Sequence, residues 1–173
     1  MVHVLRLGHR PSRDKRLTTH VLLAARAFGA SGATYTGERD KALEETIRKL
    51  VYNWGGYFSL EYVKGWRDIV SNWHGRIVHL TMYGLPLQEM IPTIRENHSE
   101  LLVIVGGPKV QGEVYSLVDW NVAVTHQPHS EVSALAVFLH ELFEGEELSI
   151  KFNGARLRVV PQEREKRIEE LKV

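Results

Sequence analysis

Cysteine is absent from the 173-residue chain. Its absence excludes a disulfide scaffold, a cysteine zinc ribbon and a thiol nucleophile, and it is typical of proteins in a reducing cytoplasm. Long apolar runs are also missing, since none reaches the roughly 18 to 20 residues that a membrane-spanning helix needs. Residues 1–8 lack the cationic start and the cleavage site of a signal peptide. We therefore expect a soluble, cytoplasmic protein with no membrane partner.

The chain also lacks an excess of charge of either sign, because its formal net charge is only +1. The chain thus lacks a general basic field for nucleic acid, but basic side chains cluster between residues 6 and 16. The sequence contains no Gly-x-Gly-x-x-Gly, no Walker lysine motif and no His-Glu-x-x-His spacing. A Rossmann dinucleotide site and a phosphate-binding loop therefore have no support, and a zinc site has little.

The hydrophobic pattern predicts one α/β domain, because 173 residues with 43% hydrophobic content suffice for a single core. Strand-like runs cover residues 2–8, 33–36, 58–63, 76–82, 101–105 and 120–124. Helix-like segments between and after them cover residues 17–28, 38–54, 66–73, 87–97 and 130–143. Strands that alternate with helices favour a mostly parallel sheet with helices on both faces.

The C-terminal part has a different pattern. Asn153-Gly154 is typical of a two-residue hairpin turn, and it predicts that residues 148–152 pair with residues 156–160. Residues 163–172 are predicted to form a charged helix or to fray. We expect residues 1–145 to form the α/β domain, and residues 146–173 to add a hairpin and tail to the same compact unit.

Ligands of open α/β sheets collect at the carboxyl ends of the strands, so three loops are candidate binding segments. They are the loop after Leu80, residues 106–110 and residues 124–131. Gly106-Gly107 allows a close approach of the backbone to a ligand, although a plain tight turn has the same pattern. His129 or Ser130 can cap the following helix, and its free N–H groups favour a polar ligand. There are two alternatives to a ligand site here. The histidines have an ordinary capping or surface role, or His126 and His129 bind a metal with Glu131.

Two blocks of sequence carry a resemblance to a known family. The first contains Leu-Gly-His-Arg-Pro at 7–11, Arg-Asp-Lys-Arg at 13–16, Thr-Thr-His at 18–20 and Arg-Ala-Phe-Gly-Ala at 26–30. The second contains Asn-Val-Ala-Val at 121–124, Gln-Pro-His-Ser-Glu-Val at 127–132 and Ala-Leu-Ala-Val-Phe-Leu at 134–139. Together they resemble the archaeal tRNA ribose methyltransferases of the SPOUT superfamily that modify a T-loop cytidine, and the resemblance extends over nearly the whole chain.

The resemblance implies a deep trefoil knot that holds S-adenosylmethionine, a homodimer, and tRNA as the partner. It places the cofactor among three knot loops, made of Leu80, Gly106, Gly107, Pro108, Lys109, Val110, Val124, Thr125, His126, Gln127, Pro128, His129, Ser130 and Glu131. It makes the basic cluster a contact for the tRNA backbone, through Arg6, Arg10, Arg13 and Lys15. The catalytic candidates are Arg16 and Arg26, which would orient the phosphate, and His20, which is chemically the better proton acceptor.

The chain departs from the family pattern at three positions. Leu23 aligns with the usual first-helix arginine, Pro108 with a glutamate, and Glu131 with an asparagine. These departures keep two other functions open at this stage. One is an RNA-binding or assembly module without catalytic activity, and the other is a metal-dependent hydrolase built on His126, His129 and Glu131.

Overall fold

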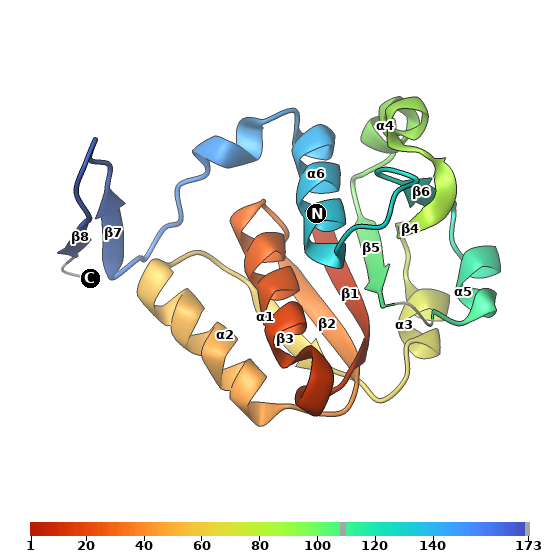
Figure 1. Ribbon diagram of the computed structural model, residues 1–173, viewed down its shortest axis with the longest axis horizontal. Helices are drawn as coiled ribbons and strands as arrows, with labels where there is room; N and C mark the ends of the chain where they lie inside the picture. Colours follow the sequence, from red (N-terminus) through yellow and green to blue (C-terminus); the bar gives the residue numbers. More distant parts are fainter. Residues whose placement is uncertain (108–109, 172–173) are drawn as a thin grey trace.

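Six parallel strands form the central sheet, in the order β3-β2-β1-β5-β4-β6 (Figure 1). The computed structural model describes residues 1–107 and 110–171. The strands are β1 (Val2–His9), β2 (Gly32–Gly37), β3 (Ser59–Tyr62), β4 (Arg76–Pro86), β5 (Leu101–Gly106) and β6 (Trp120–Ala123). The helices are α1 (Pro11–Ala27), α2 (Lys41–Trp54), α3 (Arg67–Asn72), α4 (Leu87–Glu96), α5 (Gly112–Leu117) and α6 (Glu131–Phe143).

Helices cover both faces of this sheet, as the sequence predicts. Alternate residues of the central strand β5 face opposite ways, so Leu101 and Val103 join the larger core cluster and Leu102 and Ile104 the smaller one. Buried side chains of α1, α2, α4 and α6 belong to the larger cluster, whereas α3 and α5 contribute to the smaller. Because β5 is buried on both faces, its sequence is continuously apolar, which is typical of a parallel sheet.

Helix α1 and strand β4 extend furthest beyond their predicted bounds. Helix α1 begins at Pro11, six residues before the predicted start at Leu17, because proline fits the first helical position and Arg10 binds Asp14 across the first turn. This charged turn has no apolar periodicity that could reveal it. Strand β4 continues past a bulge, and its last residues Leu85 and Pro86 pair with Val122 and Ala123 of β6.

The C-terminal hairpin is present, but the predicted pairing of its strands is wrong. Strand β7 (Leu157–Val160) pairs antiparallel with β8 (Arg167–Glu170), and residues 146–149 form a 3₁₀ helix. The segment around Asn153-Gly154 instead lies against the end of α2, where the Gly56 N–H donates to the Asn153 carbonyl oxygen at 2.7 Å. These tertiary contacts override the local turn preference, and residues predicted as a charged helix become β8.

No helix within the described residues is long and apolar enough to cross a membrane.

Candidate functional site

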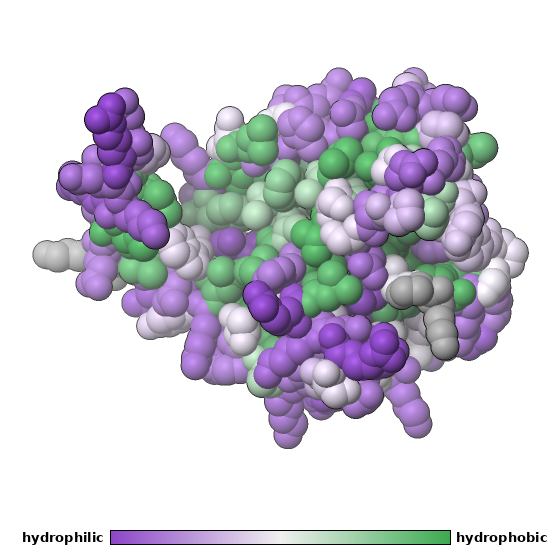
Figure 2. All heavy atoms as spheres, in the orientation of Figure 1, coloured by the Kyte–Doolittle hydropathy of each residue, from purple (hydrophilic) through white to green (hydrophobic). Residues whose placement is uncertain are grey.

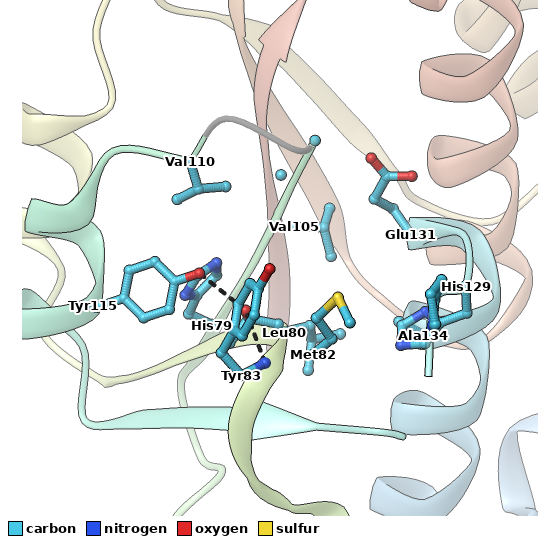
Figure 3. A pocket seen from close by; sticks show the side chains of 14 residues that line it. His79, Leu80, Met82, Tyr83, Val105, Val110, Tyr115, His129, Glu131 and Ala134 are labelled. Carbon is cyan, nitrogen blue, oxygen red and sulfur yellow. Dashed lines mark hydrogen bonds between the residues drawn. The ribbon is translucent and has the colours of Figure 1, made fainter. Parts of the chain in front are cut away.

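A cavity of about 310 Å³ opens where β4, β5 and the start of α6 meet (Figure 3). Its walls combine apolar side chains, aromatic rings and bare backbone. The lining residues are His79, Leu80, Thr81, Met82, Tyr83, Val105, Gly106, Gly107, Val110, Tyr115, Pro128, His129, Glu131 and Ala134. We call it the knot-loop cavity, after the loops to which the family resemblance assigns a knot, because all three predicted binding loops contribute to it.

Gly106 ends β5 at the wall of this cavity. A Cβ atom added there would lie 2.3 Å from the Val110 Cγ2 atom, so any larger residue would collide with the Val110 side chain. The sequence therefore places glycine where two stretches of chain pass close together. This close approach leaves backbone, rather than side chains, exposed to the cavity.

His79 is a buried histidine with a defined tautomer in the same cavity. The Asn121 side-chain N–H donates to the Tyr115 carbonyl oxygen at 2.8 Å, which turns the Asn121 amide oxygen toward His79 Nδ1 at 2.9 Å. His79 Nδ1 is therefore the donor, and Nε2 keeps a free lone pair. Burial lowers the His79 pKa, partly opposed by the bond to Asn121, so the ring is neutral at pH 7. The Tyr115 and Thr81 hydroxyls, 3.1 Å apart, complete the polar wall.

A second cavity, of about 650 Å³, adjoins the first, and its lining has four cationic side chains against three carboxylates. We call it the basic cavity. Its lining residues are Arg6, Leu7, Gly8, His9, Arg10, Arg13, Asp14, Leu17, Thr36, Gly37, Glu38, Lys64, Trp66, Gly107, Val110, Gln111 and Glu131. Gly107, Val110 and Glu131 line both cavities, so the two meet at the end of β5 and the start of α6.

Arg6 lies at this junction and is only 1% exposed. Its Nη1 donates to the Leu7 carbonyl oxygen at 2.5 Å, its Nη2 lies 4.0 Å from Glu131 Oε1, and its Nε has no hydrogen-bond partner. Burial lowers the Arg6 pKa, and the Glu131 carboxylate opposes that effect. A guanidinium remains charged in proteins, so the junction holds a buried cation.

His9 supports the floor of the basic cavity. Its Nδ1 lies 2.9 Å from the Thr18 hydroxyl oxygen, and its Nε2 lies 3.5 Å from Asp40 Oδ2. The other Asp40 carboxylate oxygen accepts from the backbone N–H groups of Ala42 and Leu43 and so caps α2. Burial lowers the His9 pKa, against the effect of the nearby Asp40 carboxylate. His9 therefore ties β1, α1 and α2 together.

The structure brings part of the predicted cofactor set together. Leu80, Gly106, Gly107, Val110, Pro128, His129 and Glu131 line the knot-loop cavity. Five other predicted residues do not line it: Val124, Thr125, His126, Gln127 and Ser130. Ser130 caps α6 by accepting from the Ser133 N–H at 3.3 Å, and His126 lies 3.0 Å from the Gly84 carbonyl oxygen. Pro108 and Lys109 lie outside the described residues.

The residues predicted to bind tRNA or to act in catalysis lie in different places. Arg10 and Arg13 line the basic cavity, whereas Lys15, Arg16 and His20 are exposed on α1 and line neither cavity. Arg6 also lines the basic cavity, although it is only 1% exposed.

Arg26, the third catalytic candidate, lines neither cavity. Its Nη2 donates to the Trp54 and Gly55 carbonyl oxygens at 3.0 and 2.6 Å, and its guanidinium lies 4.2 Å from the centre of the Phe152 ring. It is thus committed to the end of α2.

The sequence predicts Leu80 and the loop after it as one binding segment, and the structure places Thr81, Met82 and Tyr83 of that segment within β4; His79 is an addition that the sequence did not predict. Tyr115 on α5 and Lys64 were missed as well. One signal was visible: His79 interrupts an otherwise apolar strand between Val78 and Leu80, and a polar residue in such a strand needs a partner.

Across the part of the chain that the structure describes, no group of three or more His, Cys, Asp or Glu side chains could hold a metal ion.

Comparisons with known proteins identify relatives over the whole chain. The profile of the family described as tRNA ribose 2'-O-methyltransferase, aTrm56, matches residues 54–169. The tRNA (cytidine(56)-2'-O)-methyltransferase of Methanothermobacter thermautotrophicus is 53% identical over 173 residues, which cover 98% of this chain and 97% of that protein. The enzyme of the same name from Methanopyrus kandleri is 54% identical over 171 residues, with 97% and 96% covered.

Solved structures with a similar fold are more distant in sequence. A TrmH/SpoU tRNA modifying enzyme of A. aeolicus has a TM-score of 0.62 at 12% identity, over 86% of this chain and 76% of that one. The SpoU methyltransferase AviRb from Streptomyces viridochromogenes, crystallised with the cofactor AdoMet, has a TM-score of 0.60 at 12% identity, over 84% and 57%. At such identities the likeness shows a shared fold.

Proposed function

The chain belongs to the tRNA ribose 2'-O-methyltransferase family, and from this membership we propose that it methylates the 2'-hydroxyl of cytidine 56 in tRNA, with S-adenosylmethionine as the donor. The observation that carries the proposal is the junction of two unlike cavities. One has backbone and aromatic walls, the other is basic, and they share Gly107, Val110 and Glu131. A methyl donor in one cavity and a nucleotide in the other would meet at this boundary.

The knot-loop cavity suits the adenosine part of the cofactor. Leu80, Met82 and Val105 offer apolar surface, while His79 Nε2 offers one acceptor for an adenine or ammonium N–H. Gly106 and Gly107 leave the backbone accessible at the end of β5. S-adenosylmethionine supplies a methyl group already activated by its sulfonium sulfur. The protein therefore has to provide alignment of the hydroxyl and removal of its proton.

The basic cavity suits the nucleotide. Arg10, Arg13 and Lys64 line it from α1 and from the loop after β3, so they would bind phosphate oxygens and set the position of the ribose. Lys15, the residue after Asp14 on α1, is exposed and would extend this contact along the tRNA backbone. Such contacts position the substrate without reading its sequence.

We further propose the finer features that the family resemblance implies. The three loops at the knot-loop cavity would form the trefoil knot, residues 1–145 and 146–173 would act as one unit, and the protein would work as a cytoplasmic homodimer. Figure 2 supports a dimer, because hydrophobic side chains gather over α1 and α6 in that view, and Val137 of α6 is 43% exposed. In such a dimer, the exposed Arg16 and His20 of one subunit would lie at a cavity of the other. Light scattering that reports a monomer at micromolar concentration would contradict the dimer.

Methyl transfer to defined transcripts tests the function. Unmodified tRNA is incubated with S-adenosylmethionine that carries a labelled methyl group, and the labelled nucleotide is mapped. We expect label on the ribose of cytidine 56, and none on a transcript with 2'-deoxycytidine at that position. Tight tRNA binding without any transfer would instead identify an RNA-binding module.

A further inference from the structure

Glu131 occupies the boundary between the two cavities. It is the first residue of α6, and its carboxylate points away from the helix toward the end of β5 (Figure 3). A Cβ atom built on Gly107 would lie 3.6 Å from Glu131 Oε1, so the carboxylate is beside the loop that both cavities share. The side chain is 19% exposed, which leaves it accessible to a ligand.

Arg6 holds this carboxylate in place from the opposite side. The guanidinium is itself fixed, because Nη1 donates to the Leu7 carbonyl oxygen while Nη2 faces Glu131 Oε1 at 4.0 Å. It is 1% exposed, so the cation lies almost wholly inside the protein. Glu131 is the one carboxylate within ion-pair distance of Arg6 among residues 1–107 and 110–171.

Other candidate proton acceptors fail on position or on chemistry. His129 lines only the knot-loop cavity, and Glu38 only the basic cavity. Asp14 binds Arg10, and His9 is fully buried, with its Nε2 directed at Asp40 Oδ2 at 3.5 Å. The arginines are poor bases because their pKa values exceed about 12. Of the titratable side chains in the described residues, Glu131 alone lines both cavities.

We propose that Glu131 is a catalytic residue that accepts the proton of the ribose 2'-hydroxyl, and that Arg6 is the positioning residue that aims its carboxylate. This inference rests on the proposed function and names the base for that reaction. The O–H bond breaks as the proton passes to a Glu131 oxygen. The freed electron pair forms the new O–C bond to the methyl group, while the C–S bond breaks and its pair stays on sulfur.

Glu131 is one of the three positions at which the chain departs from the family pattern. An asparagine amide has no carboxylate with which to take a proton, so a family member with asparagine at this position would need another base. Here the replacement of amide by carboxylate coincides with a buried arginine directed at it.

The test measures single-turnover methylation of saturating tRNA by Glu131→Gln, which keeps shape and removes the acceptor. We expect the rate to fall about 10²- to 10⁴-fold. Affinities for S-adenosylhomocysteine and for tRNA, measured by calorimetry and filter binding, should stay within about threefold of wild type, since the shape of both cavities is unchanged apart from one atom. Glu141→Gln, an exposed acid on the same helix, is the matched control with an unchanged rate.

A second comparison tests Arg6. Arg6→Met should lower the single-turnover rate about 10²-fold through misalignment, and it should add nothing in the Glu131→Gln background. A purely structural role for Arg6 would multiply the two losses instead.

Three outcomes separate the claims. Near-wild-type transfer by Glu131→Gln overturns the role of Glu131 and leaves the proposed function intact. A loss of rate that follows entirely from lost cofactor or tRNA affinity overturns it too. A wild-type protein that transfers no methyl group to tRNA overturns the proposed function and the inference together.

Discussion

The Arg6 guanidinium lies 4.0 Å from the Glu131 carboxylate and connects the buried strand β1 to the first residue of α6. This pair stands at the junction of the two cavities, with one member 1% exposed and the other open to both. A buried ion pair gives little net stability, because desolvation offsets the attraction. Its position at the junction therefore points to function rather than to folding.

Arg26 should be essential for stability and dispensable for chemistry. Arg26→Met removes charged hydrogen bonds to two carbonyl oxygens at the end of α2, which should cost about 2–3 kcal/mol in the free energy of unfolding by urea. Arg16→Met, at an exposed position of the same helix, should change that free energy by less than about 0.5 kcal/mol. A single-turnover rate for folded Arg26→Met far below wild type would contradict the structural role.

His79 should set cofactor affinity. His79→Asn can still donate to Asn121 but lacks the Nε2 acceptor that faces the cavity, so the Kd for S-adenosylhomocysteine should rise about three- to tenfold. The exposed His74→Asn serves as the control. Isothermal calorimetry measures both, and an unchanged Kd for His79→Asn would show that the ring makes no bond to the ligand.

Stability should fall as the solution becomes acidic below pH 6.5. Burial lowers the pKa values of His3, His9 and His79, so the unfolded chain takes up protons near 6.5 while the folded chain still resists them. The histidine contribution is thus complete above pH 6.5 and is lost as the pH falls through the folded pKa values. Urea unfolding at pH 7.5, 6 and 5 should show a decreasing free energy.

The carboxylates act in the same direction at lower pH. The pKa of Asp40 is below its ordinary 3.8, despite its burial, because the Leu43 N–H, His9 and the Ala42 N–H interact with the carboxylate, and the Arg39 guanidinium lowers that of Glu44 from 4.5. Their contribution therefore disappears only below about pH 4.5. A free energy of unfolding that stays constant or rises from pH 7.5 to 5 would refute the assignment to buried histidines.

Binding of tRNA should weaken steeply with salt. If Arg10, Arg13, Lys15 and Lys64 neutralise phosphates, the logarithm of the association constant should fall linearly with the logarithm of salt concentration. Arg13→Ala should reduce the magnitude of that slope by about one, since it removes one phosphate contact. Lys151→Ala, an exposed change outside both cavities, should leave it unchanged. A slope near zero for the wild type would rule out the basic cavity as a phosphate site.

The sheet could be predicted from sequence because its strands are buried on both faces. Leu101 to Val105 is uninterrupted apolar sequence, and only a central parallel strand or a buried helix has that pattern. The hairpin could not be predicted correctly. The Asn153-Gly154 turn preference is local, whereas the bonds from Gly56 and Arg156 that hold this segment to α2 join residues distant in sequence.

The site could be predicted only in part, for a related reason. Loops at the carboxyl ends of β4 and β5 follow from topology, so Gly106 and Gly107 were identified. A basic cluster usually marks a solvated surface, yet Arg6 lies on the same face of β1 as the buried Val2 and Val4 and is itself buried. The pairing of Arg6 with Glu131 depends on the tertiary fold, and no spacing in the sequence predicts it.

A crystal structure with S-adenosylhomocysteine and a short T-arm RNA tests the account most directly. We predict adenosine density in the knot-loop cavity beside His79, the target ribose in the basic cavity, and its 2'-oxygen within hydrogen-bond distance of a Glu131 oxygen. A thioether bound outside that cavity, or a 2'-oxygen that faces away from Glu131, would contradict it.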